Sequence, residues 1–314
     1  MLKTNNVEIY RSIQEFKTVK NPVLTLGMYD GVHIGHQTII KQLNKIADKI
    51  EGESVLLTFD PHPRMVLQPN CDLKFIYTLE EKEQALAQLG LDKLIIHPFT
   101  KEFSQLTSLE FVRDLLINQI KIHTLVIGYD HHFGKNREGN FEQLEILSKE
   151  YGFNLVQIDA VDCGEIAVSS TKVRNALAEG KIEYVNDALG CKYPLSGEVV
   201  HGDKLGRTLG FPTANLKVDD LKIIPAHGVY SVNVMVDDQQ YLGLLSIGVR
   251  ATVTNSAELR VEVNILDFNE DIYGKTIHLE FLDKIRDEKK FNGLDELVEA
   301  MNQDKAHTIS KYKK

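Results

Sequence analysis

Apolar and polar positions in the first half of the chain alternate between short apolar runs and longer stretches with helical spacing. The short runs predict strands at Val23–Leu26, Ser54–Phe59, Lys93–His97, Thr124–Ile127 and Asn154–Ile158. The stretches between them predict helices at Gln37–Ile50, Glu80–Leu89, Leu109–Gln119 and Asn140–Tyr151. Because helices separate successive strands, we expect an α/β fold in which both faces of a parallel sheet are covered.

The pattern changes after about residue 184, where short β runs follow one another without long helical stretches. These runs predict strands at Leu195–Val200, Val229–Val236, Tyr241–Ile247, Leu259–Asp267 and Thr276–Leu282. Strands in such close succession indicate an antiparallel barrel or sandwich. A helix at Leu294–Met301 and a basic, frayed tail at Lys311–Lys314 are expected to close the chain. We therefore predict two abutting domains, residues 1–184 and 185–314, with Tyr184–Pro194 as the join.

Composition narrows the class of protein. The chain has 314 residues, of which 43% are hydrophobic and 26% charged, enough for two domains with separate cores. A net charge of −9 argues against non-specific binding to nucleic acid. Cys71, Cys163 and Cys191 are odd in number and widely spaced, which favours free thiols in a reducing cytoplasm. Met1–Thr18 lacks the apolar core of a signal peptide, and no apolar run approaches the ~20 residues that span a bilayer.

The most informative motif is Thr25-Leu-Gly-Met-Tyr-Asp-Gly-Val-His-Ile-Gly-His36, which follows a predicted strand and leads into a predicted helix. Free backbone N–H groups and the positive end of a helix dipole bind phosphate at such a junction. Gly35 permits close approach, and the imidazoles of His33 and His36 supply donors or positive charge. The motif predicts a nucleoside triphosphate site. It lacks the lysine of a P-loop and has no further metal ligands at zinc spacing nearby.

A second motif, Val168-Ser-Ser-Thr-Lys-Val-Arg174, offers hydroxyls and N–H groups at the start of a predicted helix. Arg174 lies one turn later, where its guanidinium reaches the same anion. Alone, this motif favours an ordinary capped helix with a surface arginine. Paired with the first motif in a parallel-sheet domain, it predicts a second part of the nucleotide site.

Together the two motifs resemble the HxGH and SSTxxR elements of the α/β nucleotidylyltransferase superfamily. The strings beginning at Gly27, Phe59-Asp-Pro-His-Pro63 and Gly128-Tyr-Asp-His-His-Phe-Gly resemble bacterial bifunctional riboflavin kinase/FMN adenylyltransferase. The resemblance covers essentially the whole chain. It implies a Rossmann-like first domain in which the FMN phosphate attacks the α-phosphorus of ATP, forming FAD and releasing pyrophosphate with Mg²⁺ present.

Roles for residues of the first domain follow from this resemblance. Because the FMN phosphate is already an anion, catalysis consists of alignment and charge neutralisation. His33 and His36 would contact the ATP phosphates, while Ser170, Thr171 and Arg174 would hold the β and γ groups. The flavin would lie against Asp60, Pro61, His62 and Pro63. The remaining nucleotide-binding residues would be Gly27, Tyr29, Asp30, Gly35, Gly128 and Asp130.

Two departures from the family pattern fall in this domain. Met28 and Tyr29 replace the usual Asn and Phe, so an amide that binds nucleotide is lost at Met28. His131 and His132 replace the more usual Phe-x pattern. Adjacent histidines suggest a metal site, but neighbouring side chains diverge and no third ligand is evident, so we expect none.

The second domain contains His201-Gly-Asp-Lys-Leu-Gly-Arg-Thr-Leu-Gly-Phe-Pro-Thr-Ala-Asn215. Its glycines recur every four residues, at Gly202, Gly206 and Gly210, so that backbone can wrap phosphates. Thr213 and Asn215 offer neutral oxygens for Mg²⁺ held on a phosphate chain. The Pro-Thr-Ala-Asn tetrapeptide resembles riboflavin kinase, whose fold is a small Greek-key barrel with a terminal helix.

The resemblance also implies the kinase residues. Glu262 would be the base for the ribityl hydroxyl of riboflavin, although periodicity alone assigns it to the polar face of an alternating strand. Arg286, Glu288 and Phe291 match the segment near the flavin. Glu262, with the phosphate-binding residues, therefore completes a second predicted site.

One further departure concerns the kinase. Where the family reads Asn-Ile-Gly-x-Arg-Pro-Thr-Phe, this chain has Ser246, Ala251 and Val253 in place of Asn, Pro and Phe, while Arg250 matches. A looser loop with less aromatic area would weaken riboflavin binding. An FMN adenylyltransferase with an impaired kinase domain is therefore the alternative to the bifunctional enzyme.

Two other classes of function remain open from the residues. One is a nucleotidylyltransferase for another acceptor, such as phosphopantetheine or glycerol phosphate, and the other is a flavin-binding regulator without activity. The leading hypothesis is a cytoplasmic enzyme, monomeric or weakly homo-oligomeric, whose partners are riboflavin, FMN, ATP and Mg²⁺, with neither nucleic acid nor membrane.

Overall fold

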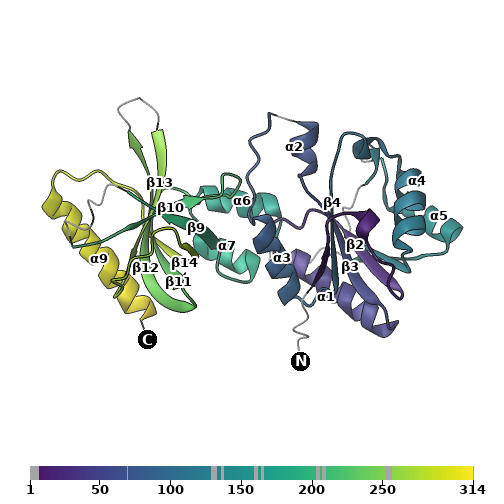
Figure 1. The fold of residues 1–314 in the computed structure, drawn as a ribbon, viewed down its shortest axis with the longest axis horizontal. Coiled ribbons are helices and arrows are strands. Elements are labelled where there is room, and N and C mark those ends of the chain that lie inside the picture. Colours follow the sequence, from purple (N-terminus) through teal and green to yellow (C-terminus); the bar gives the residue numbers. More distant parts are fainter. Residues whose placement is uncertain are drawn as a thin grey trace. The chain divides into compact units, whose positions relative to one another are not determined.

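A computed structural model describes residues 7–68, 70–128, 133–135, 138–158, 162–163, 166–202, 206, 210–251 and 257–313. Contacts within the chain divide it into two compact units, Met1–Ser169 and Ser170–Lys314. Figure 1 shows a sheet with helices in the first unit and a barrel with a long terminal helix in the second. The α/β class of the first unit and the antiparallel class of the second agree with the prediction.

The first unit is built on a six-stranded sheet with the order β1-β4-β3-β2-β5-β6, and every neighbouring pair is parallel. The strands are β1 (Glu8–Tyr10), β2 (Pro22–Leu26), β3 (Glu53–Phe59), β4 (Lys93–His97), β5 (Thr124–Gly128) and β6 (Asn154–Ile158). The parallel sheet is confirmed, whereas β1 was not predicted because three residues are too few to show a period. Two short strands, β7 (Asp162–Cys163) and β8 (Ile166–Ala167), pair separately.

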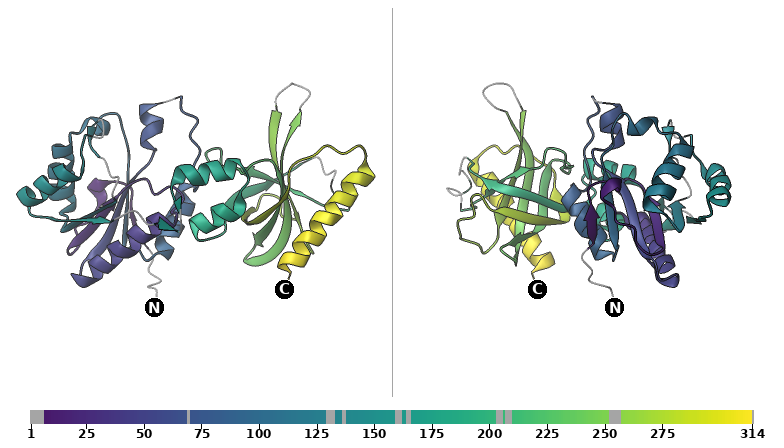
Figure 2. Two further views of the ribbon diagram at one scale, coloured as in Figure 1. Left: turned by 180° about the vertical axis from the view of Figure 1, so that it is seen from behind. Right: turned by 45° about the vertical axis from the view of Figure 1, so that its right-hand side comes forward.

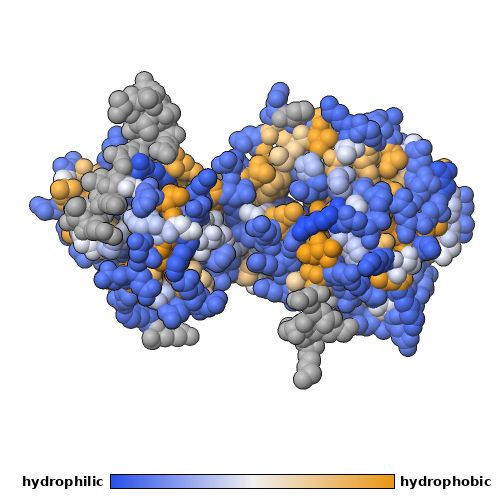
Figure 3. Space-filling model, viewed as in Figure 1, coloured by the Kyte–Doolittle hydropathy of each residue, from blue (hydrophilic) through white to orange (hydrophobic). Residues whose placement is uncertain are grey.

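Helices pack on both faces of this sheet. They are α1 (Ile34–Lys49), α2 (Pro63–Leu67), α3 (Leu79–Gln88), α4 (Ser108–Glu110), the π-helix η3 (Phe111–Ile120) and α5 (Phe141–Tyr151). Two single 3-10 turns are η1 (Ile13–Glu15) and η2 (Phe103–Gln105). Alternate residues of the buried strand β2 point to opposite faces of the sheet. On one face, Leu24 and Leu26 join the core formed with η3. Helix α1 buries its own Ile40 and Leu43. The view in Figure 3 shows a mostly hydrophilic exterior with interspersed apolar patches.

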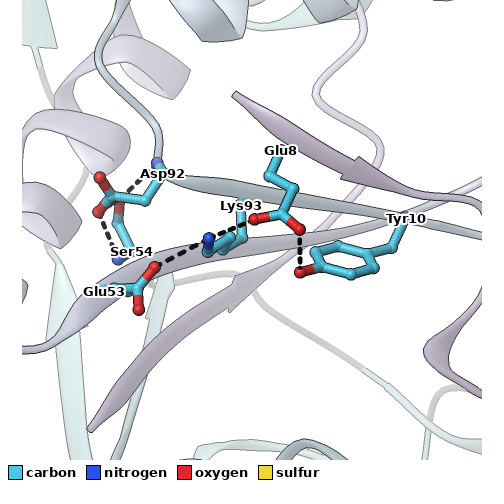
Figure 4. Close-up of polar contacts among 6 residues, drawn as sticks. All are labelled: Glu8, Tyr10, Glu53, Ser54, Asp92 and Lys93. Atoms are coloured by element: carbon cyan, nitrogen blue, oxygen red, sulfur yellow. Dashed lines mark hydrogen bonds and ion pairs between the residues drawn. The ribbon is translucent and has the colours of Figure 1, made fainter. Parts of the chain in front are cut away.

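The amino end of the sheet is held by ion pairs and hydrogen bonds, which Figure 4 shows for Glu8, Tyr10, Glu53, Ser54, Asp92 and Lys93. The ammonium of Lys93 lies 2.6 Å from Glu8 and 3.1 Å from Glu53. The Tyr10 hydroxyl donates to Glu8 over 2.6 Å, and Asp92 accepts from both the backbone and the hydroxyl of Ser54. Lys93 thus links the short edge strand β1 to β4 and β4 to β3, and Asp92 adds a second link to β3 at the start of β4.

The second unit contains a closed antiparallel barrel with the order β10-β13-β12-β11-β14-β9. Its strands are β9 (Pro194–Val200), β10 (Ala214–Val218), β11 (Gly228–Val236), β12 (Gln239–Ala251), β13 (Ala257–Ile265) and β14 (Thr276–Arg286). The barrel was one of the two predicted architectures, although β10 was not foreseen. Helix α9 (Leu294–Tyr312) lies along the outside of the barrel, as the left view of Figure 2 shows.

The last helix differs from the prediction. It runs from Leu294 to Tyr312 instead of ending at Met301, so the expectation of a frayed tail is wrong at Lys311 and Tyr312, while Lys314 lies outside the described residues. The Lys311 ammonium lies 2.7 Å from the buried carboxylate of Asp283 on β14. Because burying that carboxylate requires a positive partner, the contact keeps the basic end of the chain helical.

Two helices precede the barrel: α6 (Ser170–Ala178) packs against α7 (Ile182–Leu189), and α7 packs against β14. The Asn186 amide donates to the Phe281 carbonyl over 3.0 Å and accepts from the Tyr193 N–H over 2.8 Å. Packing therefore divides the chain after Ser169, while the functional boundary at residue 184 stays a prediction. Among the described helices, none is long and apolar enough to cross a membrane.

Candidate functional sites

The two histidines of the first motif form a stacked pair at the start of α1. His33 caps this helix, and its Nδ1 accepts the backbone N–H of His36 over 3.4 Å. The two rings stack with centroids 3.7 Å apart, and the ring of Tyr29 lies 4.6 Å from that of His36. A Cβ at Gly35 would lie 3.2 Å from two atoms of the His33 ring. Gly35 therefore gives the folded-back imidazole the room it needs.

Burial keeps both imidazoles neutral near pH 7. His33 is 7% exposed, and burial lowers its pKa to about 4. Burial, together with the neighbouring charges of His33 and Lys82, lowers the pKa of His36 well below its usual range. Because the neutral His33 accepts at Nδ1, its proton is on Nε2, and this N–H is a hydrogen-bond donor. Of the two roles the sequence allowed, donor or positive charge, the structure favours the donor.

The side chain of Asp30 fastens the loop between β2 and α1 to a neighbouring segment of the chain. Its carboxylate is buried and accepts the backbone N–H groups of Ile76 and Tyr77 over 3.0 and 3.2 Å. The neighbouring Gly31 has a φ of +78°, and a Cβ there would lie 2.8 Å from Ile76. These observed contacts hold the loop in place, and a direct contact between Asp30 and nucleotide stays a prediction.

Lys82 is a functional candidate that the sequence reasoning missed. It comes from α3, is 8% exposed, and its ammonium lies 3.4 Å from the Thr58 hydroxyl and 3.5 Å from the Met28 carbonyl. Burial lowers its pKa, and the negative charges of Asp30 and Asp60 act against that shift. Lys82 and Leu86 are the buried residues of α3, so a lysine four residues before a core leucine was the available signal.

The predicted flavin segment follows β3 at the carboxyl end of the sheet. The peptide bond between Asp60 and Pro61 is cis, and the Asp60 N–H donates to the His97 carbonyl over 3.2 Å. His62 caps α2 by accepting the Arg64 N–H over 3.0 Å, and Pro63 is the first residue of that helix. The backbone bond from Asp60 therefore holds the start of this segment beside the end of β4, and the side-chain cap of His62 fixes its other end at α2.

An aromatic cluster beside this segment was also missed. The rings of Phe59, Phe99 and Phe103 lie 5.4 to 5.6 Å apart, and His97 lies 4.8 Å from Phe103. Phe59 ends β3 and His97 ends β4, so the cluster follows the carboxyl ends of two adjacent strands. Strand ends of a parallel sheet are where ligands bind, which is the signal that could have found it.

The other residues predicted for the first site are only partly described. Gly128 ends β5, whereas Asp130, His131 and His132 lie outside the described residues. Ser170 and Thr171 form the first turn of α6, as predicted, and Arg174 lies one turn later. A joint site for the two motifs stays a prediction.

The barrel contains a cavity of about 310 Å³ in which several predicted kinase residues meet. Its lining includes Thr213, Ser246, Glu262, Arg286, Glu288 and Phe291. A second cavity of about 490 Å³ shares Thr213 with the first. The Thr213 hydroxyl donates to the Glu262 carboxylate over 3.2 Å, so these two side chains lie where the cavities adjoin.

The glycine motif packs closely around Asn215. A Cβ at Gly202 would lie 2.1 Å from the Asn215 amide, and one at Gly206 would lie 2.3 Å from the Phe211 carbonyl. Asn215 also pairs in register with Glu262 across β10 and β13. Gly210 has a φ of +83° and is open to solvent on its Cβ side. The rest of this loop, at 203–205 and 207–209, lies outside the described residues.

The departures in the kinase loop are partly visible. Ser246 lines the smaller cavity and pairs in register with Glu262. Val253 and the side chain of Ala251 lie outside the described residues. Within the part of the chain that the structure describes, no three His, Cys, Asp or Glu side chains lie together so that they could hold a metal ion. The ring of His201 lies 4.0 Å from that of Tyr273, and Tyr273 lines the larger cavity.

Comparison with known proteins identifies the family. Residues 15–172 match the FAD synthetase family model, and residues 189–311 match the riboflavin kinase model. The bifunctional riboflavin kinase/FMN adenylyltransferase of Listeria monocytogenes is 38% identical over 289 residues, covering 92% of this chain and 91% of the relative. The protein of the same description from Bacillus subtilis is 36% identical over 291 residues, with 91% of each covered.

A solved structure also matches nearly the whole chain. It is described as a macrolide-efflux protein from Streptococcus pneumoniae, is 34% identical, and superposes with a TM-score of 0.89. The match covers 97% of this chain and 99% of that one. With two family models in this order and relatives matched along almost their full length, the chain belongs to the bifunctional riboflavin kinase/FMN adenylyltransferase family.

Proposed function

We propose that this chain makes FAD in two steps, with FMN adenylylation assigned to residues 1–184 and riboflavin phosphorylation to residues 185–314. The order of the two family models along the chain supports this division. The observation that carries the kinase assignment is the pair of adjoining cavities with Thr213 and Glu262 at their junction. A phosphoryl donor in one cavity and a flavin in the other would meet there.

The adenylylation site needs alignment of two phosphates more than a protein nucleophile. Neutral His33 donates through Nε2–H, and the amino end of α1 adds the positive end of its dipole. His36 donates or accepts according to its tautomer, and its buried Nδ1 has no hydrogen-bond partner among the described residues. Ser170, Thr171 and Arg174 hold the β and γ phosphates and the departing pyrophosphate. Charge that develops on the α-phosphate is thereby stabilised by fixed donors.

The flavin of this first step lies against the rigid segment from Asp60 to Pro63. The neighbouring cluster of Phe59, Phe99 and Phe103 supplies aromatic area for a flat ring. Both features follow the carboxyl ends of β3 and β4, where a parallel sheet binds ligands. Substrate then occupies the same edge of the sheet as the His33 and His36 pair.

In the kinase step, Glu262 takes the proton from the terminal ribityl hydroxyl of riboflavin as that oxygen attacks the γ-phosphorus of ATP. ADP leaves from the larger cavity, and FMN remains in the smaller one. The donor set around Thr213 and Asn215 consists of hard oxygens beside the Glu262 carboxylate, which suits Mg²⁺ held mainly by phosphates and water. When bound there, Mg²⁺ neutralises charge on the phosphate chain.

The proposal is tested by incubating the protein with ATP and Mg²⁺, with riboflavin in one reaction and FMN in another, and separating the flavins by chromatography. FAD from both supports the two-step function. FAD from FMN alone favours the adenylyltransferase with an impaired kinase, for which Ser246 in the cavity wall is the motivating observation. No FAD from either contradicts the flavin assignment and directs attention to other phosphate acceptors.

Variants assign each step to its domain. Glu262→Gln keeps the shape of the side chain but removes the base, and should abolish FMN formation while FMN adenylylation continues. His36→Ala should abolish FMN adenylylation while riboflavin phosphorylation continues.

We further propose a cytoplasmic location, where ATP is available. We also propose a monomer or weak homo-oligomer, which light scattering at several concentrations tests directly.

A further inference from the structure

Two carboxylates fasten the terminal helix α9 to strand β14. Asp304 on α9 holds Arg286, the last residue of β14, through bonds of 3.0 Å from Nε to Oδ1 and 2.8 Å from Nη2 to Oδ2. Asp283 on β14 holds His307 at 2.9 Å and Lys311 at 2.7 Å on α9. Both carboxylates are buried, but only the first pair lines the 310 Å³ cavity.

Helix α9 forms part of the wall of that cavity. Leu297, Met301 and Asp304 line it at positions i, i+4 and i+7, which lie on one face of a helix. The helix packs against strand β12 of the barrel. The position of α9 therefore affects the shape of the cavity as well as the stability of the barrel.

The Arg286 guanidinium is held from several directions. Besides the two-pronged bond with Asp304, its Nη1 donates to the Asp287 carbonyl over 3.3 Å, and the guanidinium carbon lies 5.6 Å from the Phe291 ring centre. The Asp304 side chain is 5% exposed and that of Arg286 is 23% exposed. A paired arginine–carboxylate fork fixes orientation more strongly than a single bond does. It also cancels the guanidinium charge, which suits contact with the uncharged ring of riboflavin.

From this geometry we propose that Asp304 is a positioning residue for riboflavin: it orients Arg286 in the cavity wall and makes α9 part of the flavin site. The inference rests on the proposed kinase function, because it takes the 310 Å³ cavity as the riboflavin pocket. Asp304 itself acts through Arg286 and takes no part in phosphoryl transfer.

The test compares Asp304→Asn with Asp283→Asn in the full chain. Both substitutions replace a buried carboxylate that joins β14 to α9, so they are matched for general damage to the barrel. We expect Asp304→Asn to raise KM for riboflavin about 10- to 100-fold, with KM for ATP changed less than about twofold. Asp283→Asn should leave both constants within about twofold of the unchanged protein.

The proposal is overturned if Asp304→Asn leaves KM for riboflavin unchanged, if it raises KM for ATP equally, or if Asp283→Asn has the same effect on riboflavin. Should Asp304→Asn remove the thermal transition of the barrel, Asp304→Glu, which keeps the charge, decides by the same comparison. If the unchanged protein does not phosphorylate riboflavin, the kinase proposal fails by itself. Quenching of riboflavin fluorescence then measures binding, and Asp304→Asn must weaken it at least about tenfold.

Discussion

A lysine at each end of the parallel sheet has a shifted pKa, and the two shifts have opposite directions. At the amino end, burial lowers the pKa of Lys93, but its bonds with Glu8 and Glu53 outweigh this and raise it overall. At the carboxyl end, burial lowers the pKa of Lys82, whose ammonium reaches two neutral oxygens. His36, also at this end, keeps a buried Nδ1 without a partner among the described residues.

The difference distinguishes residues that stabilise the fold from residues that are available to bind a ligand. Hydrogen bonds at the amino end are already satisfied within the protein, so those residues serve the fold. At the carboxyl end, desolvated donors and a buried positive charge lie where a strand passes into a helix. An anionic ligand placed there gains strong, preorganised interactions because the protein has already excluded water. Substitutions at the two ends should therefore change different properties.

The largest expected effect is on catalysis at the carboxyl end. His36→Ala should lower kcat/KM for FMN adenylylation by about 100- to 1000-fold, the usual loss when one fixed donor to a developing charge is removed. The kinase step of the same variant should stay unchanged, and its rate is the internal control. An equal loss of both activities would point to unfolding, and an unchanged adenylylation rate would remove His36 from the site.

The next prediction concerns pH and stability. The pKa of His33 is about 4 in the folded chain against its ordinary value of 6.5 in the unfolded chain, so between these values the unfolded chain binds more protons. The contribution of His33 to stability should therefore be full above pH 6.5 and fall by about 3 kcal/mol as the pH drops toward 4, and His36 and His97, whose pKa values burial also lowers, add to this fall. Urea unfolding at several pH values measures this, and His33→Asn should flatten the profile. A profile as steep in His33→Asn as in the unchanged protein would contradict the assignment.

Substitution of Lys82 should lower activity less than substitution of His36, and only the adenylylation step should be affected. Lys82→Met removes the positive charge that helps to lower the pKa of His36, so the acidic limb of the pH–rate profile should move to higher pH. We expect kcat/KM at neutral pH to fall about tenfold as the phosphates lose a buried cation. An unmoved acidic limb would separate Lys82 from the histidine pair.

The smallest effect belongs to the amino end. Lys93→Met should lower the free energy of unfolding by about 1 kcal/mol, because its partners Glu8 and Glu53 are half-exposed or partly exposed. Both activities should be retained, which makes this variant the matched control for Lys82→Met. If Lys93→Met reduced adenylylation as much as Lys82→Met, the contrast between the two ends of the sheet would not hold.

Secondary structure was predictable wherever a local period was long enough. Strands β2 to β6 and the barrel strands other than β10 showed clear apolar runs, whereas β1 has only three residues and gains its place through Lys93. The terminal helix extends beyond Met301 because Asp283, in a different strand, binds Lys311. Local patterns carry no information about such a partner.

Residue types and their spacing determined, without coordinates, that the chain combines an α/β domain with a β-barrel domain, and that His33, His36 and Glu262 are candidate site residues. Periodicity and motif spacing involve residues that are near one another along the chain, so the sequence alone reveals them. Tertiary structure alone decided that Lys82 lies beneath Met28 and that Asp304 holds Arg286. Those contacts join residues 54 and 18 positions apart, and only folding makes them close enough for one group to change the charge or orientation of the other.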